Sequence, residues 1–125
     1  MTVMKHVLFV DDVSTNLKCV ALILKNKYNV TTLKSGREAL DCMKTVIPDL
    51  VLLDIHMQEM DGYEVLKHMK ENPRTADIPV ILVTADAEED SEKRGSALGA
   101  VGFVRKPFEP QTLLDEIEAV WKTEE

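Results

Sequence analysis

Short apolar runs alternate along the chain with longer segments in which apolar residues recur at helical spacing. Runs of about four residues rich in Val, Ile and Leu predict strands. The run Leu50–Leu53 contains no polar residue, which is typical of a strand that is covered on both faces. The predicted strands are Val7–Val10, Val30–Leu33, Leu50–Leu53, Val80–Val83 and Val101–Val104.

The segments between these runs predict helices. The first segment has apolar residues at positions i, i+3, i+4 and i+7, which form one stripe on a helix. These residues are Leu17, Val20, Ala21 and Leu24. Ser35 followed by Glu38 has the pattern of a capping box and predicts the start of a second helix. Asp61 followed by Glu64 predicts the start of a third helix in the same way.

Two further helices complete the alternation of strand and helix. The fourth is predicted from near Ala87 to Leu98, and Pro110 is well suited to the first turn of the fifth. Strand and helix alternating five times predict an α/β domain with a parallel sheet. Right-handed crossovers bring the carboxyl ends of such strands to one edge, where ligands bind. The residues that directly follow the strands are therefore the candidates for a functional site.

Composition narrows the classes of protein that the chain can belong to. Its 125 residues, 45% of them hydrophobic, are enough for one domain with a single core. The net charge of −7 and the lack of a basic run argue against sequence-independent nucleic-acid binding. The apolar runs are too short to span a membrane, and residues 1–6 lack the apolar region of a signal peptide. Cys19 and Cys42 have no zinc-site spacing, and we interpret them as buried reduced thiols of a cytoplasmic protein.

Charged and polar residues follow four of the five predicted strands. Asp11 and Asp12 follow the first strand and Asp54 follows the third, while Thr84 and Lys106 follow the fourth and fifth. Each residue alone is most simply a turn former or a helix cap. Because all of them reach the same edge of a parallel sheet, their coincidence predicts a functional site.

Charge arithmetic indicates what this site does. Two carboxylates about 4 Å apart repel by about 4 kcal/mol at an effective dielectric constant near 20, so three together raise their pKa values or recruit a cation. A hard cation such as Mg²⁺ takes oxygen ligands, and with one lysine it brings three acids close to neutrality. A phosphoryl group can then bind, and a carboxylate can serve as its acceptor by forming an aspartyl phosphate.

The motifs FVDD, DLVLLDIHM, MDGYE, IPVILVTA, LGA and KPF occur in this order along the chain. In order and spacing they resemble the receiver domains of response regulators in two-component signalling, of the chemotaxis-regulator type, over essentially the whole chain. The resemblance implies a doubly wound, flavodoxin-like parallel sheet of five strands in the order 2-1-3-4-5 with five flanking helices. It implies one receiver domain over residues 1–125, and the sequence leaves open whether this domain belongs to a larger protein with an output domain.

The resemblance also implies a role for each site residue. Asp54 is the implied phospho-acceptor, Lys106 the contact of the phosphoryl oxygens, and Thr84 a donor to the phosphoryl group that switches together with Phe103. The Lys106–Pro107 peptide bond is expected to be cis. The implied ligands of Mg²⁺ (or Mn²⁺) are Asp12 directly, Asp11 through water, Asp54, and the backbone carbonyl of His56. No other cofactor is expected.

Departures from the family pattern lead to further hypotheses. Met57-Gln58 stands where the family often has Met-Pro, so we expect a less rigid loop. His56 and Asp86 flank the site, and we hypothesise that they set the dephosphorylation rate; the alternative is that both are plain rim residues. Phe103 lacks the hydroxyl of the common tyrosine, and we expect it either to prefer the buried rotamer even without phosphorylation or to be a core residue in both states.

The implied partners are a sensor histidine kinase or histidine phosphotransfer protein as phosphodonor, and an unidentified output domain or protein. The fourth helix, fifth strand and fifth helix are expected to form the face that switches; a homodimer is left open, and neither nucleic acid nor membrane is expected to bind. The chain is not expected to be an enzyme beyond its own phosphorylation and dephosphorylation. The alternatives are a phosphorylation-independent pseudo-receiver and an aspartyl-phosphate phosphatase. The phosphatase is disfavoured because Asp11-Asp12 lacks D-x-D spacing, and a flavodoxin because two acids replace its phosphate loop.

Overall fold

The computed structural model describes residues 4–85 and 89–122, and over these residues the chain forms a parallel five-stranded sheet. The strand order is β2-β1-β3-β4-β5, in agreement with the prediction, and every neighbouring pair is parallel. The chain adds β2 on one side of β1 and β3 on the other, so the strand order reverses between β1 and β3. Ligands bind at this point in sheets of this kind. The strands are β1 (His6–Val10), β2 (Asn29–Leu33), β3 (Leu50–Leu53), β4 (Val80–Thr84) and β5 (Gly102–Arg105).

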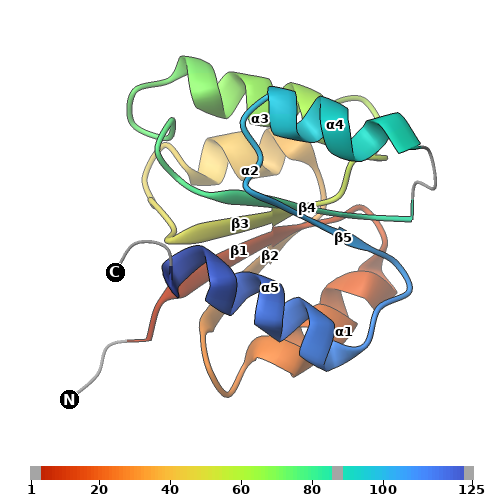
Figure 1. The fold of residues 1–125 in the computed structure, drawn as a ribbon. Coiled ribbons are helices and arrows are strands. Elements are labelled where there is room, and N and C mark those ends of the chain that lie inside the picture. Colours follow the sequence, from red (N-terminus) through yellow and green to blue (C-terminus); the bar gives the residue numbers. More distant parts are fainter. Residues whose placement is uncertain (1–3, 86–88, 123–125) are drawn as a thin grey trace.

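Helices cover both faces of the sheet. Figure 1 shows α1 and α5 on one face and α2, α3 and α4 on the other. The predicted starts of the second and third helices are confirmed, because Ser35 Oγ accepts a hydrogen bond from the Glu38 N–H (3.1 Å) and Asp61 Oδ1 accepts one from the Glu64 N–H (2.9 Å). The helices are α1 (Ser14–Leu24), α2 (Gly36–Cys42), α3 (Gly62–Glu71), α4 (Glu89–Ala97) and α5 (Pro110–Lys122).

The alternating directions of side chains along each strand divide the core between the two faces. In β1, Val7 and Phe9 pack with α1 and α5, whereas Leu8 and Val10 pack with α2 and α3. All of these side chains are fully buried, as are those of Leu50–Leu53. Burial on both faces explains why the strands are apolar without alternation.

Three details differ from the sequence-based expectation or limit its test. The fifth strand begins at Gly102, and Val101 is 57% exposed before the strand. Cys19 is exposed, so the interpretation as a buried thiol is wrong for this residue, since it lies off the stripe of α1 that faces the sheet; Cys42 is partly buried. The predicted start of the fourth helix at Ala87 falls outside the described residues.

Within the described part of the chain, no helix has the length and apolarity needed to cross a membrane.

Candidate functional site

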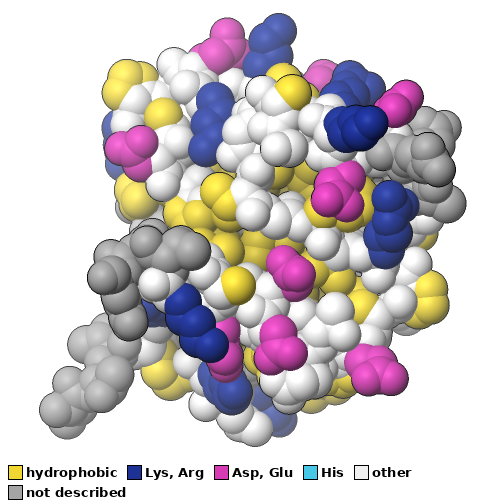
Figure 2. Space-filling view, viewed as in Figure 1, with side chains coloured by type: hydrophobic (Ala, Val, Ile, Leu, Met, Phe, Trp, Pro, Cys, Tyr) yellow, Lys and Arg dark blue, Asp and Glu magenta, His cyan; other side chains and the backbone are white. Residues whose placement is uncertain are grey.

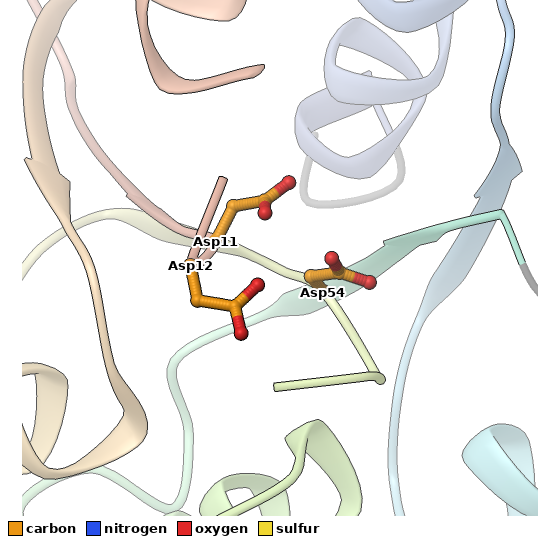
Figure 3. A group of neighbouring side chains, drawn as sticks. All are labelled: Asp11, Asp12 and Asp54. Atoms are coloured by element: carbon orange, nitrogen blue, oxygen red, sulfur yellow. The ribbon is translucent and has the colours of Figure 1, made fainter. Parts of the chain in front are cut away.

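The ends of β1 and β3 bring three carboxylates together. Val10 is the register partner of Leu53, so the next residues along the two strands, Asp11 and Asp54, lie side by side. The Asp54 N–H donates to the Val10 carbonyl (2.9 Å), which continues the strand pairing into the site. Figure 3 shows the side chains of Asp11, Asp12 and Asp54 gathered at this edge, and one oxygen of each lies within 4.8 Å of the others. The predicted acidic cluster is therefore present.

Lys106 reaches the same cluster from the end of β5. Its N–H donates to the Thr84 carbonyl (2.8 Å), and the bond to Pro107 is cis, as the resemblance implies. The Lys106 Nζ lies 2.5 Å from Asp11 Oδ2 and 3.3 Å from Asp54 Oδ2. One ammonium thus contacts two buried carboxylates, and its positive charge offsets part of their negative charge.

Asp11 is fully buried and held in place by several donors. Its Oδ1 accepts a hydrogen bond from the Val13 N–H (2.9 Å), and its Oδ2 accepts from Asn16 Nδ2 (3.1 Å) as well as from Lys106. Asn16 was not among the site residues predicted from the sequence. Its position in the first turn of α1, a few residues after an acid at a strand end, was the available signal. These contacts fix the orientation of the Asp11 carboxylate.

Asp12 is exposed and takes a different environment. Its Oδ2 accepts a hydrogen bond from the main-chain N–H of Gln58 (3.2 Å), which joins the loop after β1 to the loop after β3. A proline, which the family often has at this position, has no N–H to donate. The departure at Gln58 therefore adds a contact to the acidic cluster that was not predicted from the sequence.

Burial and neighbouring charges act on Asp54 in opposite directions. The residue is 6% exposed, and this burial raises the pKa of its carboxyl above the usual value. The charge of Lys106 opposes the rise, the charge of Asp11 adds to it, and hydrogen bonds from Lys106 and Thr84 lower the pKa again. The net direction is upward. The ionised form of Asp54 is therefore less favoured than that of a solvent-exposed carboxyl, and added positive charge would favour it.

The remaining predicted site residues lie around this centre. The His56 N–H points to Asp54 Oδ1 (3.4 Å), and the residue is exposed beside the site. Thr84 is buried at the end of β4. Phe103 is partly buried and packs against the core under α2 and α3, with the Arg105 guanidinium 5.1 Å from its ring centroid. Asp86 lies outside the described residues, and the hypotheses on dephosphorylation rate and on the rotamer of Phe103 stay predictions.

The donor set agrees with the hard cation that the sequence predicts. Carboxylates and backbone carbonyls offer only oxygen, which Mg²⁺ and Mn²⁺ take in preference to nitrogen or sulfur. With one lysine against three acids, the cluster keeps an excess of negative charge that a divalent cation would neutralise.

Comparison with known proteins agrees with this geometry. Residues 7–118 match the family model of the response regulator receiver domain. A probable cyclic di-GMP phosphodiesterase of Vibrio cholerae is 43% identical over 81% of this chain and 23% of its own length. The response regulator SaeR of Staphylococcus aureus is 38% identical over 89% of this chain and 48% of its own length. The chain thus spans about a quarter and about half of these two relatives.

Solved structures share the whole fold. The chemotaxis response regulator CheY4 of Vibrio cholerae superposes with a TM-score of 0.88 at 32% identity, covering 94% of this chain and 99% of that one. The BeF₃-activated receiver domain of DrrB superposes with a TM-score of 0.84 at 30% identity over 96% of this chain and 99% of that one. The chain belongs to the receiver domains of two-component response regulators.

Proposed function

We propose that this domain accepts a phosphoryl group on Asp54 from a phosphohistidine of a sensor histidine kinase or histidine phosphotransfer protein, in a Mg²⁺-dependent reaction. The observation that carries the proposal is the position of the Lys106 ammonium, 2.5 Å from Asp11 and 3.3 Å from Asp54, within a cluster of three carboxylates. This arrangement places a nucleophile beside fixed positive charge, and phosphoryl transfer depends mainly on positioning and charge stabilisation.

In the proposed reaction, one carboxylate oxygen of Asp54 attacks phosphorus while the phosphorus–nitrogen bond of the phosphohistidine breaks. The imidazole of the donor leaves with the electron pair and takes up a proton, and Asp54 becomes an acyl phosphate. Lys106 helps to keep Asp54 ionised despite burial, and its ammonium stabilises the charge on the transferred group. The Thr84 hydroxyl donates a hydrogen bond to the Asp54 carboxylate, and we propose that it donates to the phosphoryl oxygens after transfer.

The proposed metal ligands divide by environment. Asp12 is exposed and Asp54 is buried, and we propose that both contact the metal directly, with the backbone carbonyl of His56 completing the set. Both oxygens of Asp11 already accept hydrogen bonds from Val13, Asn16 and Lys106, which favours contact through water. When bound, Mg²⁺ supplies positive charge to the acids and to the phosphoryl oxygens. The proposed role of His56 and Asp86 is to set how long the phosphoryl group survives.

The proposed output is a change on the face formed by α4, β5 and α5. Figure 2 shows apolar side chains gathered over β5 between α4 and α5, with acidic side chains beside them. Phe103 is the register partner of Leu82 in β4, two residues before Thr84, so movement of Thr84 toward a phosphoryl group can reach Phe103 across one strand pair. This face then controls a partner protein, a second copy of the chain, or an output domain of a longer protein.

The family also supports a proposal for the domain organisation and cellular location of the protein. We propose that residues 1–125 form one receiver domain that acts in the cytoplasm and turns over no foreign substrate. The two relatives, of which the chain spans about a quarter and about half, support an output domain joined to it in a longer protein.

Mass spectrometry after treatment with acetyl phosphate and Mg²⁺ tests the proposal. We expect a single added phosphoryl group that is absent in Asp54→Asn and present in the control Asp41→Asn, which removes an acid from the surface of α2. EDTA should prevent the addition. Lack of phosphorylation under all conditions would favour a phosphorylation-independent interaction module, and multiple turnover of a foreign phosphoester would favour a phosphatase.

A further inference from the structure

The helix α4 is held by few apolar contacts. Its sequence, EDSEKRGSA, contains no large apolar residue. It approaches the sheet at Gly95, where an added Cβ would lie 2.3 Å from Leu82 Cδ1. A helix without an apolar stripe gains little from burial, so its position depends on particular polar contacts.

Tyr63 of α3 supplies such contacts. Its hydroxyl donates to the main-chain carbonyl of Ser91 in the first turns of α4 (3.2 Å), and both residues are buried. The Arg94 guanidinium, one turn further along α4, lies 4.1 Å from the centroid of the Tyr63 ring. A buried hydrogen bond and a cation–π contact from one side chain thus attach α4 to α3.

The other end of this link lies against the phospho-acceptor. Gly62 directly precedes Tyr63, and a Cβ on Gly62 would lie 2.3 Å from the Asp54 carbonyl oxygen and 2.8 Å from Ile55 Cα. The Gly62 N–H also donates to the Ile55 carbonyl (2.7 Å). Because the backbone is packed this closely, a displacement of the Asp54–Ile55 segment would be transmitted to Gly62 and to Tyr63 beside it.

The surroundings leave α4 room to move. A cavity of about 400 Å³ lies between the start of α4 and the loop after β3, and its lining includes Ile55, His56, Tyr63 and Arg94. On the other side, α4 begins five residues after Thr84, the last residue of β4. Thr84 is therefore close to α4 along the chain, and Tyr63 holds the first turns of the helix.

We propose that Tyr63 restrains α4 in the unphosphorylated protein and couples the state of Asp54 to the face formed by α4, β5 and α5. This rests on the proposed function, and it assigns to Tyr63 a part that the Thr84–Phe103 pair does not cover. Removing the hydroxyl weakens the unphosphorylated arrangement relative to the switched one. A probe that favours the switched arrangement then binds more tightly, by at most the factor by which the substitution shifts the equilibrium toward that arrangement.

Tyr63→Phe tests the proposal because it removes the hydroxyl and keeps the ring. Tyr28→Phe, on the opposite face of the sheet beside Trp121, is the matched control. We expect amide hydrogen exchange of residues 89–97 to rise about threefold to tenfold in Tyr63→Phe without phosphodonor, the factor for one neutral hydrogen bond, with β1 and β3 unchanged. Affinity for beryllium fluoride in the presence of Mg²⁺, followed by fluorine NMR, should rise by a similar factor. The control should change neither quantity.

Three outcomes would overturn the proposal. Unchanged exchange in α4 would show that the hydrogen bond does not restrain the helix. Faster exchange with unchanged affinity for beryllium fluoride would leave Tyr63 a structural contact without coupling. A wild type that does not bind beryllium fluoride would contradict the proposed function itself, whereas binding of equal strength in wild type and Tyr63→Phe would overturn only the coupling.

Discussion

Replacement of Asp54 by asparagine should stabilise the metal-free protein. The substitution keeps the size of the side chain and an oxygen that can accept from Lys106, but it removes one negative charge from the acidic cluster. Lys106 stays paired with Asp11 at 2.5 Å, so the change leaves no buried cation without a partner. A gain in stability on loss of this functional residue would show that burying the ionised Asp54 carboxylate costs stability.

Distances in the site give the size of the effect. One carboxylate oxygen of Asp54 and one of Asp11 lie within 4.8 Å of each other, and two unit charges separated by that limit repel by about 3.5 kcal/mol at an effective dielectric constant of about 20. Asp12 adds a smaller repulsion because it is exposed, and Lys106 at 3.3 Å attracts Asp54 by about 5 kcal/mol. These contributions nearly cancel, and burial of the ionised carboxylate remains. We therefore expect Asp54→Asn to raise the free energy of unfolding by about 1–2 kcal/mol at neutral pH.

Urea denaturation in EDTA over a range of pH measures this effect. The pKa of Asp54 is raised in the folded state, so the folded protein binds more protons than the unfolded chain between the two pKa values. The contribution of Asp54 to stability is therefore fully present below the ordinary carboxyl pKa and is lost as pH rises through the raised value. The gain in stability of Asp54→Asn over wild type should therefore be absent below the ordinary carboxyl pKa and should appear as pH rises through the raised pKa.

Added Mg²⁺ should reverse the order of stability. At about one hundred times its Kd, a ligand of the folded state stabilises by about 2.7 kcal/mol, and this gain should be smaller in the variant that lacks the Asp54 charge. Asp41→Asn on the surface of α2 removes one negative charge elsewhere and should shift stability by less than about 0.5 kcal/mol. If Asp54→Asn is no more stable than wild type in EDTA at neutral pH, the electrostatic reasoning is wrong.

Three further changes test other contacts of the site. Lys106→Met should lower the free energy of unfolding in EDTA by about 2 kcal/mol or more, because it leaves the buried carboxylates of Asp11 and Asp54 without their cation. It should also slow labelling by acetyl phosphate at least about tenfold, and labelling at the wild-type rate would contradict the proposed role of Lys106. Asn16→Ala removes a hydrogen-bond donor to Asp11 and should lower the free energy of unfolding, measured by urea denaturation, by about 1 kcal/mol. Thr15→Ala is the neighbouring control, and an equal loss of stability in both variants would argue that the Asn16–Asp11 contact does not stabilise the protein. Glu59 has a left-handed φ of 67°, so Glu59→Gly should raise the melting temperature, and a lower one would show that no strain is stored there.

Local pattern predicted the elements and their chain order. The capping residues Ser35 and Asp61 begin helices as expected, because a cap acts on amide groups only two or three residues away. The buried strands were recognisable because a strand covered on both faces must be apolar throughout. The resemblance to a known family then gave the strand order, which short-range pattern alone does not contain.

Details of the site depended on contacts between distant parts of the chain. Lys106 and Asp11 are 95 residues apart in the sequence, and the Gln58 N–H reaches Asp12 across 46. Their meeting depends on strand register, on the crossovers and on the path of two loops. The raised pKa of Asp54 likewise requires burial and charge to be known together.

The sequence by itself determined which residues stand at the ends of the strands, because periodicity, caps and apolar runs are local properties. Only the tertiary structure decided that Cys19 is exposed, that Asn16 holds Asp11, and that Tyr63 contacts α4. The physical reason is that side-chain direction and contact between elements arise from packing of the whole domain. A residue's neighbours in space are set by the pairing of the elements that carry it, which no short segment encodes.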